Sequence, residues 1–102
     1  MRDPTDLHQQ ALDAEAQRQR DELKAKQERD DLIWLMGTKP GRRIASRILG
    51  MTGVYRNPFN NSGSVMAFNC GQMNVGQQWL AQIMEHAPDR YLELLKEAKT
   101  ND

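Results

Sequence analysis

Residues 32–43 read Leu32-Ile33-Trp34-Leu35-Met36-Gly37-Thr38-Lys39-Pro40-Gly41-Arg42-Arg43, and this stretch decides how the chain is divided. It begins with an apolar run that follows a densely charged segment. Gly37 and the pair Pro40-Gly41 then interrupt any helix that enters the stretch. The charged residues before it and the more apolar residues after it are therefore expected to form separate parts.

The chain has 102 residues, enough for one small domain, and its hydrophobic fraction of 38% predicts a modest core. No apolar run approaches the roughly 20 residues that a membrane-spanning helix needs. We expect three parts that differ in charge and apolar content. They are a charged helical arm at 1–31, a compact helical domain at 32–98 and a polar tail at 99–102.

The segment before the break is predicted to be one long helix. Residues 6–36 contain neither glycine nor proline and are rich in the strongest helix formers. Asp3 or Thr5 can cap this helix, and Pro4 suits its first turn. Opposite charges recur at helical spacing, and each such pair adds about 0.2–0.5 kcal/mol.

The apolar side of this helix is thin, and its charges are spaced to pair with one another, as at Arg18 and Glu22. A heptad count from Leu7 places charged residues at three of nine core positions, which argues against a coiled coil. A helix that is polar all round either bridges solvent or is held by a partner. We interpret it as a projecting arm; the alternative is a partly frayed helix without a partner.

Residues 42–51 are predicted to form the first helix of the compact domain. Its apolar residues at helical spacing are Ile44, Ile48 and Met51 on one face, with Ala45 and Leu49 beside it. A turn-rich linker follows over 54–64. The aromatic residues Tyr55 and Phe59 are expected to pin this linker to the core.

Two more helices are predicted after the linker. The first is capped by Ser62 or Ser64, or else begins later, near Asn74. Its apolar stripe is Val65, Phe68, Val75, Trp79 and Ile83, joined by Leu80 and Met84. Pro88 ends this helix and opens the last one, whose expected buried face is Tyr91, Leu94, Leu95 and Ala98.

These patterns predict an all-α fold, with a long polar N-terminal helical arm followed by a small helical core of about three helices. No strand alternation and no internal repeat competes with it. Trp34 and Trp79 have leucine and isoleucine neighbours, so we interpret both as core residues. The alternative is that they are exposed anchors for a partner.

The 14 basic and 14 acidic residues cancel over the whole chain but are unevenly placed. Residues 1–31 hold 6 basic and 9 acidic residues, a net of −3, and residues 32–102 hold 8 basic and 5 acidic, a net of +3. The stretch from Leu32 to Met84 has no acidic residue, which favours binding of an anion or an acidic partner surface. The alternative is that acids from the flanking segments fold back and neutralise it. The candidate binding residues are Arg42, Arg43, Arg47 and Arg56.

The chain offers little material for catalysis. His8 and His86 are far apart in the sequence, and Cys70, the single cysteine, has no evident histidine partner. Residues 37–43 lack the spacing of a phosphate-binding loop. We expect no enzymatic activity, no catalytic residue, no metal and no cofactor. With no secretory signal and one cysteine, synthesis is expected in a reducing cytoplasm.

A series of short motifs runs in order from Leu32 to Glu97. The motifs are Trp34-Leu35-Met36, Gly41-Arg42-Arg43, Ile48-Leu49, Gly53-Val54-Tyr55-Arg56, Phe59, Ala67-Phe68-Asn69, Gly71, Asn74-Val75-Gly76, Leu80-Ala81, Ile83, Pro88, Tyr91 and Glu97. In this order they resemble a family of small virion-gene proteins of tailed bacteriophages, of the Bordetella-podophage type. The resemblance implies a gene among the head-assembly and neck genes and no specific mechanism.

Two classes of function follow from these observations. The first is a structural virion component, bound through the arm and the basic core surface to a larger phage protein at the portal, head interior, capsid or tail. Such a protein is expected to be oligomeric in the assembly and to reside in the mature particle. The alternatives are a nucleic-acid-binding packaging or regulatory accessory that contacts packaged DNA, and a transient scaffold or chaperone.

Overall fold

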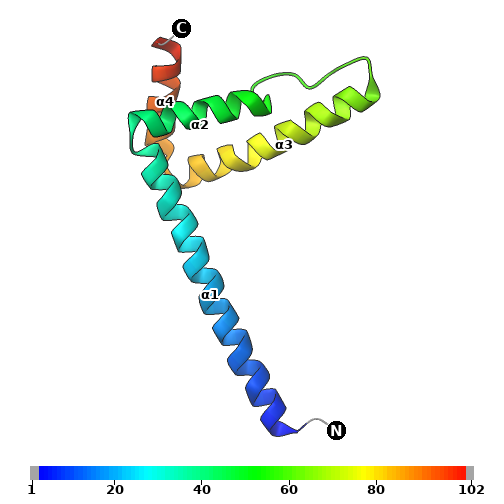
Figure 1. The fold of residues 1–102 in the computed structure, drawn as a ribbon, viewed down its shortest axis with the longest axis vertical. Helices are drawn as coiled ribbons and strands as arrows, with labels where there is room; N and C mark the ends of the chain where they lie inside the picture. The colour runs from blue at the N-terminus through cyan, green and yellow to red at the C-terminus, as the bar shows by residue number, and fades with distance from the viewer. Residues whose placement is uncertain (1–2, 101–102) are drawn as a thin grey trace. The chain divides into compact units, whose positions relative to one another are not determined.

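The computed structural model describes residues 3–100, which form four helices and no strand (Figure 1). The predicted all-α class and the long N-terminal helix are confirmed. Of the expected polar tail, Lys99 and Thr100 continue the last helix, and residues 101 and 102 lie outside the described part. The helices are α1 (Pro4–Met36), α2 (Lys39–Thr52), α3 (Gly63–His86) and α4 (Pro88–Thr100).

The chain divides into two compact units, with the boundary inside α1 after Asp31. Between Asp3 and Asp31 no side chain is buried, and the leucines of this unit lie in solvent. Arg18 forms ion pairs with Glu15 and Glu22, one turn before and one turn after it. The first unit is thus a helix held by its own backbone and by pairs along its surface.

The second unit begins at Leu32, in the last turns of α1, and includes α2, α3 and α4. The corner between α1 and α2 is tight, since a Cβ atom added at Gly41 would lie 2.8 Å from the carbonyl carbon of Leu35. Thr38 caps α2 by accepting a hydrogen bond from the Gly41 amide at 3.1 Å. Gly53 ends α2 with a φ of +70°, a conformation that glycine adopts without strain.

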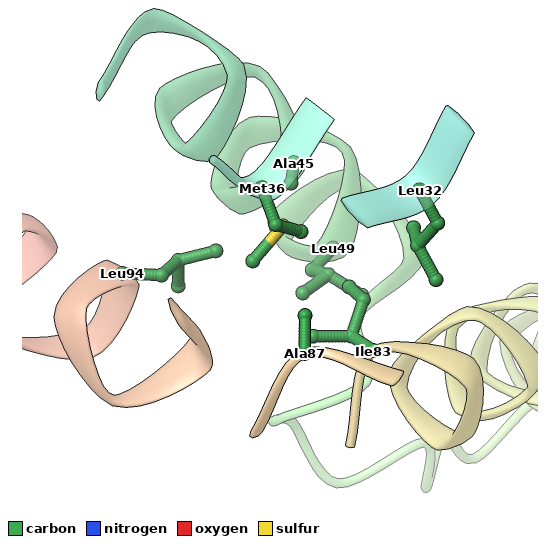
Figure 2. Packing of buried hydrophobic residues seen from close by; sticks show 7 residues of the cluster. All are labelled: Leu32, Met36, Ala45, Leu49, Ile83, Ala87 and Leu94. Atoms are coloured by element: carbon green, nitrogen blue, oxygen red, sulfur yellow. The ribbon is translucent and has the colours of Figure 1, made fainter. Parts of the chain in front are cut away.

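The core of the second unit is small, and Figure 2 shows side chains from all four helices meeting in it. Met36 and Leu49 are its most completely buried large side chains. The other members are Leu32, Ala45, Ile83, Ala87 and Leu94. The residues expected to face inward from α2, namely Ile44, Ile48 and Met51, are instead exposed. The buried side of α2, which packs against α3 and α4, contains Ala45 and Leu49 and lies next to the predicted face.

The stripe predicted on α3 is confirmed only at Ile83, which is buried in the core, and at the partly buried Leu80 that packs against it. The helix begins at Gly63 with Ser62 as its cap, so the later start near Asn74 is wrong. Its inward line is Gly76 and Ile83, because a glycine lets α3 approach the end of α2 closely. Phe68, Val75 and Trp79 lie to one side of that line and stay exposed, and Val65, which precedes Ile83 by five turns on the line itself, is exposed as well.

Other aromatic residues are also less buried than predicted. Trp34 is 75% exposed, so it lies outside the core. Phe59 is exposed as well and does not pin the linker. Tyr55 does reach α4, but through its hydroxyl, which lies 2.8 Å from the hydroxyl of Tyr91. On α4 only Leu94 is fully buried, and Leu95 is exposed.

No helix among the described residues is both long enough and apolar enough to cross a membrane.

The close approach at Gly76 leads to a stability prediction. A Cβ added there would lie 2.8 Å from Cβ of Thr52 and 2.9 Å from Cβ of Val54. Gly76→Ala is therefore expected to lower the free energy of unfolding by about 1–3 kcal/mol, despite the better helix propensity of alanine. Urea denaturation followed by circular dichroism measures the change.

Gly50→Ala is the matched control, because a Cβ at that helical position meets nothing within 4 Å. It is expected to leave stability unchanged or raise it by up to about 1 kcal/mol. Equal effects of the two substitutions would contradict the packing of α3 on α2.

Candidate partner-binding surface on α2

The best-organised polar cluster of the second unit is centred on Arg42, near the start of α2. Arg42 stands one turn before Ala45 and two turns before Leu49, so helical spacing places it on the buried line of α2. Its relative exposure is 7%, and it is the one charged residue among those fully buried between residues 3 and 100.

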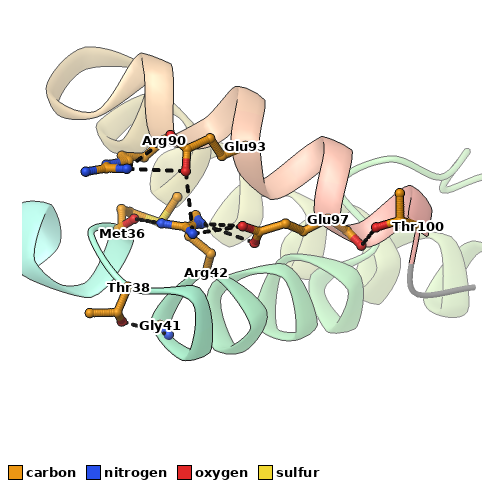
Figure 3. Close-up of polar contacts among 8 residues, drawn as sticks. All are labelled: Met36, Thr38, Gly41, Arg42, Arg90, Glu93, Glu97 and Thr100. Carbon is orange, nitrogen blue, oxygen red and sulfur yellow. Dashed lines mark hydrogen bonds and ion pairs between the residues drawn. The ribbon is translucent and has the colours of Figure 1, made fainter.

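Every side of the Arg42 guanidinium is occupied by a partner within the chain (Figure 3). Nε donates to both carboxylate oxygens of Glu97 at 3.1 Å, and Nη2 donates to Oε1 of Glu97 at 2.8 Å. Nη1 donates to the carbonyl oxygen of Met36 at 3.0 Å, and a carboxylate oxygen of Glu93 lies 3.5 Å from Nη2. One side chain on α2 thus joins the end of α1 to α4.

The charges around Glu97 favour its ionised form. The hydrogen bonds from Arg42 lower the pKa of Glu97 below its ordinary value, and the charges of Lys39 and Arg43 act in the same direction. Glu93 is also held by Arg90, whose Nη1 donates to it at 3.0 Å. The acids of α4 therefore neutralise part of the basic block of α2.

This arrangement corrects the prediction that Arg42 binds an outside anion. Its donors are already directed at Glu97, Glu93 and Met36, and the residue is buried, so it is not available to a partner. For Arg42, the alternative that acids from a flanking segment fold back describes the structure.

Arg43 and Arg47 are placed differently. Both are exposed, one turn apart on α2, and both border a hollow of about 310 Å³ between α2 and α4. The lining of this hollow is Arg42, Arg43, Ser46, Arg47, Leu94, Glu97 and Ala98. Arg43 and Arg47 are the two predicted site residues that the structure brings together in an exposed position, where they can contact a carboxylate or a phosphate.

Arg56 lies away from this pair. It follows the end of α2, and its guanidinium donates to the carbonyl oxygen of Gly50 at 2.9 Å. It borders a smaller hollow of about 110 Å³ together with Gly53, Asn57 and Asn69. Arg56 therefore helps to close the C-terminal end of α2, although its side chain remains exposed to solvent.

A third, apolar hollow lies between the end of α1, α2 and α3. It has a volume of about 260 Å³ and opens at the exposed side chains Ile48 and Trp79. Its full lining is Leu32, Leu35, Ala45, Ile48, Leu49, Trp79 and Ile83. Of the predicted stripe of α3, Trp79 and Ile83 line this hollow, and Ile83 also belongs to the core.

The scattered histidines and the cysteine do not form a site. Among residues 3–100 no group of three or more potential metal ligands lies together. Cys70 is exposed on α3, and the nearest carboxylate to the His86 ring nitrogen is that of its neighbour Glu85, at 3.7 Å.

Residues 33–96 match the family model of the Bbp19-like phage proteins, and this match covers more than half of the chain. The chain belongs to this family. The resemblance seen over Leu32 to Glu97 is therefore confirmed. The matched segment comprises the end of α1, then α2, α3 and most of α4. Searches of curated proteins and of solved structures returned no significant match.

Sequence reasoning did not identify Glu97 as the partner of Arg42. A signal was present in the helical spacing, because Glu97 stands three residues after the buried Leu94, as Arg42 stands three before the buried Ala45. Both charges lie on inward lines of their helices. Once α2 and α4 pack through those lines, the two charges must meet or remain unpaired.

The Arg42–Glu97 contact predicts a pH-dependent loss of stability. We expect Glu97→Gln to lower the melting temperature at pH 7 by roughly 5–10 °C, because a neutral amide removes the nearest counter-charge of the buried guanidinium and leaves only the more distant Glu93. The pKa of Glu97 is lowered in the folded state, so its contribution is present above the ordinary pKa of 4.5 and is lost as the pH falls below it. The difference between the native chain and the variant should shrink from pH 7 to pH 3.

Thermal melts followed by circular dichroism at several pH values measure this difference. Glu85→Gln is the control, because Glu85 is exposed and holds only a long contact to His86. A gap between native and Glu97→Gln melting temperatures that is as large at pH 3 as at pH 7 would contradict the electrostatic role of Glu97.

Proposed function

We propose that this chain is a non-enzymatic structural or assembly component of a phage particle. In this proposal it binds a larger phage protein at the portal, head interior, capsid or tail. The observation that carries the proposal is the apolar surface that the second unit leaves exposed. Its family supplies the phage setting.

The exposed apolar residues are of the types that dominate protein interfaces. Trp34 is 75% exposed, Phe68 65% and Trp79 46%. Tryptophan and other aromatic residues are enriched in interfaces, and tryptophan most of all in their energetic centres. A small helical unit that keeps three such rings in water gains stability when a partner covers them.

The charged first unit supplies a different kind of surface. Its leucines are spread among Arg, Lys, Glu and Asp side chains, and none is buried between Asp3 and Asp31. A long helix of this kind suits a partner that offers complementary charges. We infer that the two units make separate contacts in the assembly.

The polar groups support a structural role over a catalytic one. The best-organised polar cluster is the one around Arg42, and its hydrogen bonds join α1, α2 and α4 to one another. In our proposal the chain is made in the host cytoplasm, uses no cofactor or membrane, and remains in the mature virion.

Quantitative mass spectrometry of purified, nuclease-treated particles of the encoding phage tests this function. We expect a fixed number of copies per particle. A ratio that is a small multiple of the portal ring would indicate the neck, tail or internal core, and a ratio that follows the capsid protein would indicate the shell. Absence from mature particles, with presence in assembly intermediates, would overturn the virion role in favour of a transient scaffold or chaperone.

A nucleic-acid-binding accessory is the second candidate, and the exposed pair Arg43 and Arg47 favours it. If these residues contact phosphates, affinity for duplex DNA falls steeply with salt. The double variant Arg43→Ala/Arg47→Ala should then lose about 2 units of the slope of log K against log salt concentration, as two lost phosphate contacts require.

Fluorescence anisotropy with a labelled duplex at several salt concentrations measures the slope. Lys99→Ala is the control, because Lys99 is an exposed cation at the far end of α4. Absence of binding at low salt, or a slope that the double variant leaves unchanged, would remove this candidate.

A further inference from the structure

The helix α3 has a surface that is unusual for a helix in solvent. From Asn57 to Met84 the chain contains no Asp, Glu, Lys or Arg. Yet most of α3 is exposed, and its buried residues are only Gly76 and Ile83. A helix exposed to water normally carries charged residues on its outer side, whereas depletion of charge is typical of interface cores.

The exposed apolar residues of this region form one face. Val65, Phe68, Val75 and Trp79 follow one another at steps of three, seven and four residues, which places them along one side of α3. Ile48 borders the same hollow as Trp79, and Ile44 precedes Ile48 by one turn of α2. We call these residues the α3 face: Ile44, Ile48, Val65, Phe68, Val75 and Trp79.

The size of the α3 face approaches what a stable dimer needs. The exposed parts of the Phe68 and Trp79 rings alone amount to about 200 Å². With its four aliphatic side chains, the face reaches the upper part of the range of about 300–600 Å² for the largest apolar patch of a typical monomer. A standard interface buries about 800 Å² on each partner, and the polar rim of Gln and Asn side chains on α3 can supply the rest.

The absence of charge narrows the choice of partner. Nucleic acid is disfavoured, because α3 offers no cation to a phosphate backbone between Gly63 and Met84. A membrane surface is disfavoured for the same reason, since interfacial helices carry Lys or Arg on their polar face. The complementary surface is an uncharged, apolar protein face, and two copies of the α3 face meet this requirement without placing like charges opposite each other.

We propose that two copies of this chain associate through their α3 faces, related by a twofold axis. Phe68, Val75 and Trp79 of each copy pack against the same residues of the other, and the apolar hollow at Ile48 and Trp79 becomes part of the interface. The inference does not depend on where the protein acts, because a virion component, a scaffold and a DNA-binding accessory could each be built from such a dimer. A monomeric chain found in particles would overturn this inference and leave the proposed function intact.

Sedimentation equilibrium of the full chain from about 1 to 200 µM tests the proposal. We expect a species of twice 11.7 kDa, with a dissociation constant on the order of micromolar. Phe68→Lys and Val75→Lys should each weaken dimerisation by at least about tenfold, because each places two unpaired charges in the interface. Both positions are exposed, so circular dichroism should show unchanged helicity.

Leu92→Lys is the matched control, because Leu92 is an exposed apolar residue on α4, outside the α3 face. It should leave the dissociation constant unchanged. A monomer over the whole concentration range would overturn the proposal. So would a dimer that Leu92→Lys weakens while Phe68→Lys does not.

Salt supplies a second test. Because the α3 face carries no charge, raising NaCl from about 0.05 to 0.5 M should leave the dimer as tight or slightly tighter. A dimer that dissociates at high salt would be held by the opposite net charges of residues 1–31 and 32–102, and the α3 proposal would be wrong.

Discussion

The second unit depends on the contact between Arg42 and Glu97. The guanidinium reaches both oxygens of one carboxylate and, from its other edge, the carbonyl oxygen of Met36. A forked, planar donor can satisfy a carboxylate and a helix-terminal carbonyl together, which a lysine cannot do. This contact sets α4 against α2 and closes the corner where α1 ends. Since removal of one partner leaves a buried charge, the two residues act as one unit.

The small core follows from the same packing. The inward lines of α2 and α3 contain alanine and glycine, so the helices approach closely but bury few large side chains. The large apolar residues beside these lines remain in water, on a surface that spans α2 and α3. A core of this size is stabilised when another protein surface covers the exposed rings, and this connects the fold to our proposals of assembly and self-association.

The basic block also divides into residues with different uses. Arg42 is hydrogen-bonded to Glu97 inside the domain, and Arg56 binds a carbonyl oxygen near the end of α2. Of these four arginines, only Arg43 and Arg47 form an exposed pair. Counting charges along the sequence cannot distinguish a buried arginine from an exposed one. The distinction depends on which residues share a helical line with buried alanine and leucine, and on which acids of α4 come opposite.

The sequence alone determined the order and type of the elements. Glycine and proline at 37–41 interrupt the long helix and Pro88 opens α4, because these residues act through local backbone geometry. Ser62 was one of two candidate caps of α3, and the structure selected it over Ser64 and over a start near Asn74. The family was also readable from the order of short motifs. Only the tertiary structure decided which side of each helix is buried. On α2 and α3 the apolar residues cover more than one side, so helical spacing alone allowed two different sides of each helix to face the core. The close approach at Gly76 and the Arg42–Glu97 contact selected between them. The selected packing leaves Phe68, Val75 and Trp79 in solvent.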